Sequence, residues 1–201
     1  MIVLNYKEKE REKLTILVNF IGQPSSGKTS LSAKLFARLK EMNLNVEYSP
    51  EYVKSWCYEN KRVDKYGQYT IFGEEVRQQS RLFNVVDIAI SDSPVMLTGF
   101  YNFYYNGDNS LSGACHGFYK KAEEDKVQVV NFFLPRKKKY IAKGRYQTQE
   151  EADALAFQLK EWLNKEGYEY AVLECPDKER INVVIEKLKE MTGDFDGMVM
   201  A

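Results

Sequence analysis

Residues 14–30 read LTILVNFIGQPSSGKTS, a hydrophobic run followed by a loop of glycine, proline and serine. The run at 14–20 is rich in β-formers and breaks at Gly22, which predicts a short buried strand of a parallel sheet. After the loop the period changes, because apolar residues recur at helical spacing at Leu31, Leu35, Leu39 and Met42. Strand, glycine-rich loop and helix are therefore expected in that order.

The loop from Gly22 to Thr29 matches the pattern GxxxxGK[ST] and stands between a strand and a helix, as phosphate binding requires. The alternative is a serine-rich turn that fits the pattern by chance. Glycines let backbone N–H groups turn toward phosphate oxygens, and the helix N-terminus adds a favourable dipole. Lys28 is expected to reach the β- and γ-phosphates, and Thr29 to bind Mg²⁺. The residues expected to bind the nucleotide are Gly22, Ser25, Ser26, Gly27, Lys28, Thr29, Ser30 and Arg136.

Four later hydrophobic runs predict further strands at Val46–Tyr48, Val85–Ser91, Val127–Leu134 and Tyr168–Leu173. Strands that alternate with helices imply a mostly parallel sheet covered on both sides, with ligands at the carboxyl ends of the strands. We therefore expect an α/β protein with the three-layer P-loop NTPase fold, a five-stranded sheet and a short lid. Residues 1–193 are expected to form one domain, and residues 194–201 a frayed C-terminal tail.

Helical patterns fill the connections between these strands. Residues 73–86 are compatible with a helix that has Val76, Phe83 and Val86 on its apolar face. Thr148 and Glu151 form a capping-box signature ahead of a strongly periodic segment, and the last helix is expected to end at Gly193. Residues 106–117 begin NGDNSLSG and are expected to be a polar loop of the kind that is often mobile.

Composition limits the classes of partner. Lysine plus arginine equals aspartate plus glutamate at 29 each, so no overall charge favours nucleic acid or an anionic membrane. Cys57, Cys115 and Cys175 are odd in number and lack a CxxC pair, which argues against a disulfide framework and a zinc site. No apolar run approaches the roughly 18 residues of a membrane span. We expect a cytoplasmic protein without a membrane partner, and the sequence indicates no oligomeric state.

Two acidic residues follow predicted strands at the same edge of the sheet. Asp92 ends the third strand, where a carboxylate can hold the metal or accept a hydrogen bond from a substrate; the alternative is a turn aspartate ahead of Ser93 and Pro94. Glu51 lies just past the second strand and could be the general base that takes the proton of an acceptor hydroxyl. A solvated glutamate favoured by a helix N-terminus is the alternative for Glu51.

A basic segment between the fourth strand and the capped helix, residues 136–147, is the expected lid. Arg136, Lys143 and Arg145 could supply cations to the transferring phosphate when the lid closes and excludes water. A solvated charge run is the alternative, and it suits Lys137–Lys139 better than Arg145. The single histidine, His116, is expected on a surface loop rather than in a metal site.

Over nearly its whole length the chain resembles the P-loop nucleoside and nucleotide kinases, especially small proteins related to the ribosylnicotinamide kinase domain that are frequent in bacteriophage genomes. The resemblance rests on GQPSSGKTS, EYVKSW, QYTIFGEEVRQQSRL, SDSPVMLTGFY and KKKYIAKGRYQTQEEA. It implies that Glu51 is the base and that Trp56 lines the acceptor pocket. Ser93 stands where deoxynucleoside kinases have an arginine, and Lys143 where ribosylnicotinamide kinases have an aspartate, so the acceptor is left open.

The expected activity is transfer of the γ-phosphate of ATP to a hydroxyl of a nucleoside, nucleotide or related small molecule. ATP and Mg²⁺ are the expected cofactors, although no motif selects ATP over GTP. The catalytic candidates are Lys28, Glu51, Asp92 and Arg145, and the metal ligands Thr29 and Asp92.

Two alternatives to this activity stay open. One is a kinase acting on a hydroxymethylated base within DNA, as in phage hypermodification, which needs a groove outside the pocket. The candidate groove comprises Arg136–Lys139, Tyr101, Tyr104 and Tyr105. The other is an NTP-hydrolysing switch with a protein partner, which needs only the P-loop and Asp92.

Overall fold

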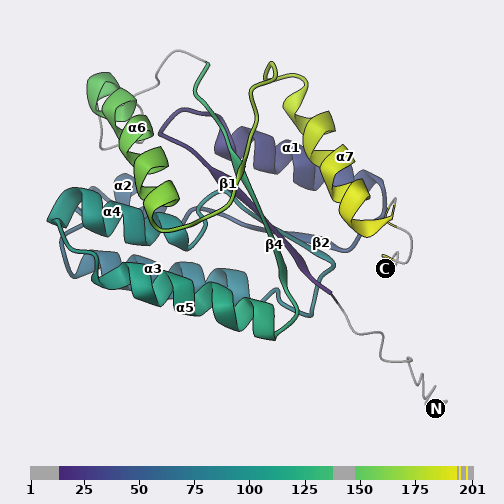
Figure 1. Cartoon of the computed structure of the whole chain (residues 1–201), viewed down its shortest axis with the longest axis horizontal. Coiled ribbons are helices and arrows are strands. Elements are labelled where there is room, and N and C mark those ends of the chain that lie inside the picture. Colours follow the sequence, from purple (N-terminus) through teal and green to yellow (C-terminus); the bar gives the residue numbers. More distant parts are fainter. Residues whose placement is uncertain (1–13, 138–147, 194, 196–197, 199–201) are drawn as a thin grey trace.

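The computed structural model of the protein describes residues 14–137, 148–193, 195 and 198. Its helices and strands alternate along most of this length (Figure 1). The strands are β1 (Ile16–Ile21), β2 (Val46–Ser49), β3 (Ile88–Ser91), β4 (Gln128–Phe133) and β5 (Ala171–Val172). The helices are α1 (Lys28–Glu41), α2 (Val53–Tyr58), α3 (Gly67–Ser80), α4 (Met96–Asn106), α5 (Ser110–Glu124), α6 (Gln149–Lys165) and α7 (Arg180–Thr192).

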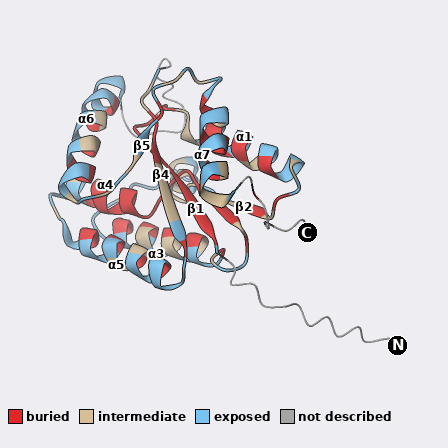
Figure 2. Ribbon diagram, turned by 45° about the vertical axis from the view of Figure 1, so that its right-hand side comes forward, coloured by how far each residue is buried: buried red, intermediate tan, exposed pale blue. Residues whose placement is uncertain are grey.

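The five strands form one sheet in the order β2-β3-β1-β4-β5, and every neighbouring pair is parallel. The expected three-layer α/β fold is confirmed. Helices α1 and α7 cover one face of the sheet, while α3, α4, α5 and α6 lie on the other side (Figure 1). All of β1 is buried between these layers (Figure 2), so its residues pack on both faces, as a continuous hydrophobic run predicts.

Two of the expected boundaries shift for local reasons. The predicted helix at 73–86 begins earlier, at Gly67, because the Asp64 carboxylate accepts hydrogen bonds from the amides of Tyr66 and Gly67 and turns the chain into α3. The chain then turns at Asn84, which has a φ of 58°, so β3 begins only at Ile88. The capping box at Thr148 is confirmed, and Gly193 ends α7 in the left-handed conformation.

The expectation of a polar loop at 106–117 is wrong. Only residues 107–109 connect α4 to α5, and Asp108 accepts hydrogen bonds from the Ser110 amide and hydroxyl at 2.8 Å each. Helix α5 then buries a stripe at helical spacing: Leu111, Cys115, Phe118 and Ala122. The expectation of a frayed tail is wrong at Phe195, which is only 7% exposed and packs in the core beside α1 and α7.

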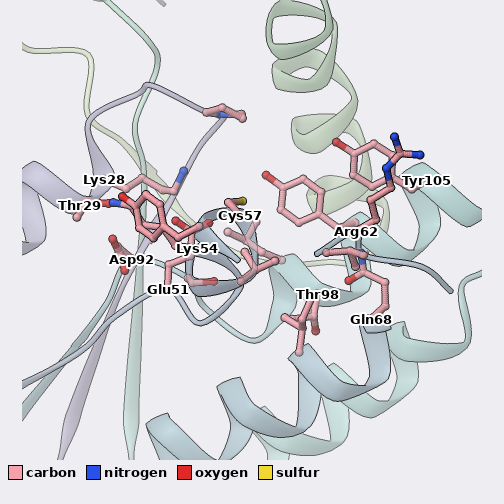
Figure 3. A pocket seen from close by; sticks show the side chains of 18 of the residues that line it. Lys28, Thr29, Glu51, Lys54, Cys57, Arg62, Gln68, Asp92, Thr98 and Tyr105 are labelled. Carbon is pink, nitrogen blue, oxygen red and sulfur yellow. The ribbon is translucent and has the colours of Figure 1, made fainter. Parts of the chain in front are cut away.

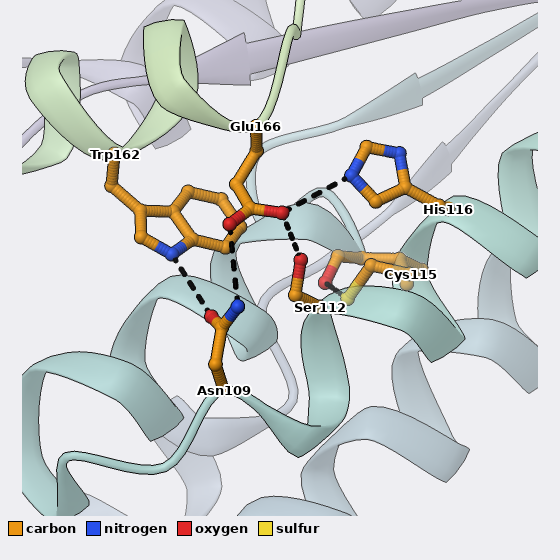
Figure 4. Close-up of polar contacts among 7 residues, drawn as sticks. Asn109, Ser112, Cys115, His116, Trp162 and Glu166 are labelled. Carbon is orange, nitrogen blue, oxygen red and sulfur yellow. Dashed lines mark hydrogen bonds and ion pairs between the residues drawn. The ribbon is translucent and has the colours of Figure 1, made fainter.

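Glu166, directly after α6, ties that helix to α5 (Figure 4). Its carboxylate accepts hydrogen bonds from Asn109 at 3.3 Å and from the Ser112 hydroxyl, and it lies 3.3 Å from His116 Nε2. His116 is exposed as expected, but it lies on α5 rather than in a loop, with its ring stacked on Tyr168. The residue after α6 therefore holds the N-terminal turn of α5, where a negative charge is also favoured by the helix dipole.

Replacing Glu166 with alanine is expected to lower the free energy of unfolding at pH 7 by about 1–3 kcal/mol, because two donors lose a partly buried acceptor. Burial acts to raise the pKa of Glu166, but hydrogen bonds from Ser112, Asn109 and His116 outweigh it and leave the pKa below its ordinary 4.5. The stabilisation is therefore present above pH 4.5 and is lost as the pH falls further.

Urea unfolding of the wild type and Glu166→Ala at pH 7 and near pH 3 measures this effect. The exposed Glu161 of α6 supplies the control variant, Glu161→Ala, expected within about 0.5 kcal/mol of the wild type. A Glu166→Ala deficit that is the same at both pH values would contradict the assignment.

Candidate active site

The loop between β1 and α1 has backbone geometry that its two motif glycines make possible. A Cβ atom on Gly22 would lie 2.6 Å from the carbonyl oxygen of Leu134, so no larger residue fits there. Gly27 has a φ of 96° and forms the N-cap of α1, which has no side-chain cap. The loop thus curls around the uncapped N-terminus of a helix, which is an anion-binding arrangement.

Lys28 begins α1 and folds back across the loop. Its Nζ donates hydrogen bonds to the carbonyl oxygens of Gly22 at 2.7 Å and Gln23 at 3.4 Å. Ser26 is buried, and its hydroxyl has no hydrogen-bond partner within the described part of the chain. Ser30 is exposed on the first turn of α1 and lies away from the main cavity, whereas Lys28 and Thr29 line it.

A cavity of about 590 Å³ opens beside the loop (Figure 3). Lys28, Thr29, Glu51 and Asp92 lie at one end of it, and Arg62, Gln68, Thr98 and Tyr105 at the other. The remaining lining residues are Pro24, Val53, Lys54, Cys57, Tyr58, Val63, Ile71, Ser93, Leu97, Tyr101 and Glu151. The structure therefore brings Lys28, Thr29, Glu51 and Asp92 together, at the carboxyl ends of β1, β2 and β3 where a parallel sheet places ligands.

Asp92 and Thr29 are the two cavity residues that could hold Mg²⁺ together with phosphate. Asp92 follows β3, is 1% exposed and has an Oδ1 atom with no hydrogen-bond partner among the described residues. Burial, and secondarily the Asp92 carboxylate, raise the pKa of Tyr48 on β2, so this neighbour stays neutral. Mg²⁺ typically takes one or two protein ligands together with substrate phosphates and water, which these two residues fit. No cluster of three or more His, Cys, Asp or Glu side chains suited to a metal occurs in the described ranges.

Glu51 lies in the turn between β2 and α2, two residues before the helix begins at Val53. Its side chain is half-buried and lines the cavity at the end where Lys28 and Asp92 lie (Figure 3). The position suits a general base, and it is also the start of a short helix, so both sequence interpretations remain compatible with the geometry.

Trp56 does not line the cavity, contrary to what the resemblance implied. It lies on α2 with its ring 6.3 Å from that of Tyr52, and Gly67 of α3 packs against it so closely that an added Cβ would approach to 3.0 Å. The residues of α2 that line the cavity include Lys54 and Cys57, which are neighbours of Trp56 on this helix. A helix as short as α2 presents only some of its residues to one side, and the sequence pattern does not reveal which.

Sequence reasoning missed the residues at the far end of the cavity. Gln68 is 5% exposed on the buried face of α3, and its amide lines the cavity. Arg62 is exposed at the rim and forms no ion pair with a described residue. Tyr101 and Tyr105, expected in an outer groove, belong to the wall of this cavity. The available signal was QYTIFGEEVRQQ, where polar residues recur at helical spacing.

The structure describes the first two residues of the predicted lid, Arg136 and Lys137. Arg136 does not line the main cavity; its side chain is 8% exposed, and its guanidinium forms an ion pair with Asp153 on α6. Lys137 donates to the carbonyl oxygen of Glu174. Lys143 and Arg145 lie outside the described residues, as does the rest of 138–147.

Glu75 is a fully buried carboxyl beneath the cavity. Its Oε1 accepts a hydrogen bond from the Tyr52 amide at 3.0 Å. Burial raises the pKa of Glu75 to about 8, and the carboxylates of Glu51 and Asp92 add to the rise, although hydrogen bonds from Tyr52 and Ser93 oppose it. At neutral pH the group is therefore mainly protonated.

This raised pKa predicts a pH-dependent stability. The folded state holds the Glu75 proton more tightly than the unfolded chain, so its stabilisation is full below pH 4.5 and is lost as the pH rises to about 8. Glu75→Gln cannot titrate. The free energy of unfolding of the wild type minus that of Glu75→Gln should therefore fall between pH 5 and pH 8, by at most about 1.4 kcal/mol per pH unit.

Urea unfolding at several pH values provides the measurement, and Glu74→Gln, on the outward face of the same helix, is the control. Glu51 and Asp92 are present in both the wild type and the variant, so the difference isolates Glu75 and its coupling to these two carboxylates. A flat difference across this range would show that Glu75 is ionised in the folded protein.

None of the helices formed by the described residues is long and apolar enough to cross a membrane. No curated protein matches the chain in sequence.

Solved structures and one family model do match. The NadR protein in complex with NR has a TM-score of 0.67 at 20% identity, covering 90% of this chain and 53% of its own, so the chain spans about half of that protein. Thymidylate kinase from Ehrlichia chaffeensis has a TM-score of 0.58 at 17% identity, covering 89% and 99%. Deoxyadenosine kinase from M. mycoides with bound dATP has a TM-score of 0.55 at 16% identity, covering 86% and 98%.

These likenesses establish the fold. A family model described as an AAA domain matches residues 17–180, which run from β1 to the start of α7 and contain the whole phosphate-binding loop. The chain therefore belongs to this AAA domain family and has the P-loop fold shared by nucleoside and nucleotide kinases.

Proposed function

We propose that the protein is a kinase that transfers the γ-phosphate of ATP to a hydroxyl group of a nucleoside-like small molecule. The observation that carries the proposal is the single cavity shared by Lys28, Thr29, Glu51 and Asp92. A phosphate-binding loop alone supports nucleotide binding. A further carboxylate, Glu51, at the same end of the cavity, with space beyond it, supports an acceptor as well.

In the donor half, the loop amides and Lys28 would hold the β- and γ-phosphates. Lys28 Nζ now donates to loop carbonyl oxygens, and phosphate oxygens would replace these acceptors. Thr29 and Asp92 would hold Mg²⁺, which when bound neutralises negative charge on the phosphates. ATP is proposed as the commoner donor among kinases of this fold, and Arg145, from the segment expected to close over the site, as a further cation for the transferring group.

In the acceptor half, Glu51 would accept the hydroxyl proton as the oxygen attacks the γ-phosphorus, the bond from that phosphorus to the β–γ bridging oxygen breaks and ADP leaves. A hydroxyl that keeps its proton is a poorer nucleophile, so the base lowers the barrier to this step. The far end of the cavity combines the Gln68 amide with Tyr101 and Tyr105, so a planar ring carrying hydrogen-bonding groups is suited to it. The volume of about 590 Å³ falls within the roughly 300–1,000 Å³ range of small-molecule sites. This favours a free acceptor over a base within a polymer.

Incubation with γ-labelled ATP and separate acceptors tests the proposal. The panel comprises nucleosides, nucleoside monophosphates and hydroxymethylated DNA, with Lys28→Met protein as the control for contaminating kinases. Label is expected on a nucleoside-like small molecule, and only with the wild type. Label found solely as free phosphate with every acceptor would overturn the kinase proposal, and label on DNA alone would replace the proposed acceptor class.

A further inference from the structure

Helix α3 carries a polar stripe on its buried face. Its buried residues are Gly67, Gln68, Ile71, Glu75 and Gln79, and three of these five are polar. Glu75 and Gln79 are each 0% exposed. Burying polar side chains is unfavourable unless hydrogen bonds compensate for lost water, so their partners indicate what the stripe does. Gln68 faces the cavity, whereas Glu75 and Gln79 contact the two segments that carry the candidate carboxylates.

Glu75 holds the segment that contains Glu51. Its Oε1 accepts a 3.0 Å hydrogen bond from the amide of Tyr52, and that amide belongs to the peptide unit joining Glu51 to Tyr52. Because a peptide unit is planar, fixing its N–H direction also restrains the backbone from which the Glu51 side chain extends. Glu51 lies in a turn outside regular structure, so this bond from α3 supplies an anchor that strand pairing does not.

Gln79 holds the segment that contains Asp92 in the same way. Its Nε2 donates to the carbonyl oxygen of Ser93 at 3.0 Å, one residue beyond Asp92, and makes a longer contact of 3.5 Å with Glu75 Oε2. Its Oε1 is buried without a hydrogen-bond partner among the described residues. The reverse amide orientation would set Oε1 against the Ser93 carbonyl oxygen, so the donor end must face that loop.

We propose that Glu75 and Gln79 are positioning residues that lock the Glu51 and Asp92 segments to one helix and so fix the two carboxylates relative to each other at one end of the cavity. This inference rests on the proposed function, because it assigns the geometry of that same site. Transfer between bound groups depends steeply on their alignment, and a shift of about 1 Å can cost 10²-fold in rate.

The charge state of Glu75 is consistent with this positioning role. A carboxyl that stays mainly protonated at neutral pH accepts a hydrogen bond without placing a third full negative charge beside Glu51 and Asp92. Glutamine is close in shape to a protonated glutamate, so Glu75→Gln should keep the acceptor for the Tyr52 amide. Leucine is of similar size but offers no acceptor, so Glu75→Leu removes the anchor.

The test compares Glu75→Leu, Glu75→Gln and Gln79→Leu with Glu74→Leu. Glu74 is the matched control because it stands next to Glu75 but pairs with Arg77 on the outward face of α3. We expect Glu75→Leu to lower kcat by about 10-fold to 100-fold with KM for ATP within about twofold, and Gln79→Leu to lower kcat similarly. Glu75→Gln and Glu74→Leu should stay within about threefold of the wild type in kcat.

Two further readouts separate positioning from general damage. In a Glu51→Gln background, Glu75→Leu should change kcat by less than about twofold, since the residue through which it acts is already gone. Hydrogen exchange at the Tyr52 amide should be at least about tenfold faster in Glu75→Leu and unchanged in Glu75→Gln.

Equal kcat losses in both backgrounds, or an unchanged Tyr52 exchange rate in Glu75→Leu, would overturn the inference. Should Glu75→Leu fail to fold, the loss of kcat caused by Gln79→Leu is compared between the wild-type and Asp92→Asn backgrounds instead. Equal losses in these two backgrounds would likewise overturn the inference. If the wild type phosphorylates no acceptor, the proposed function fails, while the Tyr52 exchange rate still decides whether Glu75 anchors the Glu51 segment.

Discussion

Lys28→Met protein is expected to transfer phosphate about 10²-fold to 10³-fold more slowly than the wild type, as losing one preorganised charge at a transition state typically does. Methionine keeps much of the apolar stem that packs along the loop and removes only the ammonium group. In the wild type that group already lies over the loop, bonded to the carbonyl oxygen of Gly22 at 2.7 Å. Little reorganisation is then needed for it to reach phosphate.

Steady-state transfer rates and nucleotide binding by calorimetry measure this effect. Lys40→Met is the matched control, because Lys40 is at the far end of the same helix, where its ammonium pairs with Glu47 at the surface and lies 5.5 Å from the centre of the Phe36 ring. Losing this surface ion pair should change the free energy of unfolding by no more than about 1 kcal/mol and leave the rate of phosphate transfer unchanged. Transfer by Lys28→Met within threefold of the wild type would remove the P-loop lysine from the mechanism and leave the cavity without its proposed donor site.

The parts of the molecule that could be predicted from the sequence are those whose signals are local. The hydrophobic run of β1, the glycines of the loop and the capping box at Thr148 each act through neighbours a few residues away. Residue types at fixed spacing therefore carry the information. That Glu51 and Asp92 line one cavity could also be predicted, because residues that follow parallel strands meet at one edge of the sheet.

Helix α5 was missed because Gly, Asn and Ser dominate its approach and first turn, and these residues favour turns in short stretches. Asp108 in fact closes the turn within three residues by accepting hydrogen bonds from Ser110, and the apolar stripe from Leu111 to Ala122 then packs against the domain. Tertiary burial of that stripe outweighs local propensity.

The role of the polar face of α3 could not be predicted from the sequence for a different reason. Amphipathic periodicity divides a helix into apolar buried and polar exposed faces, and it has no means of marking polar residues that are buried to hold a site. Glu75 is buried because its partner is the Tyr52 amide, 23 residues earlier in the chain. No local pattern records that contact, although a mostly polar helix in a small domain is itself a signal.

Glu51→Gln is expected to slow transfer by about 10²-fold or more, while binding of ATP changes by no more than about twofold. Glutamine keeps the shape and the helix-start position of the residue but cannot accept the acceptor proton. Single-turnover transfer with saturating ATP measures the chemical step directly. Glu59→Gln is the control, since Glu59 follows the same short helix α2 and pairs with Lys61 at the surface.

The two interpretations of Glu51 make opposite predictions for this variant. If Glu51 only stabilises the start of α2, its charge contributes at most about 1 kcal/mol to folding, and Glu51→Gln would transfer phosphate at the wild-type rate with slightly reduced stability. If it is the base, stability is nearly unchanged and the transfer step is lost. Because Glu51 lines the same cavity as Lys28 and Asp92, we expect the loss to appear in the chemical step rather than in acceptor binding, and a variant that loses only acceptor affinity would contradict the assignment.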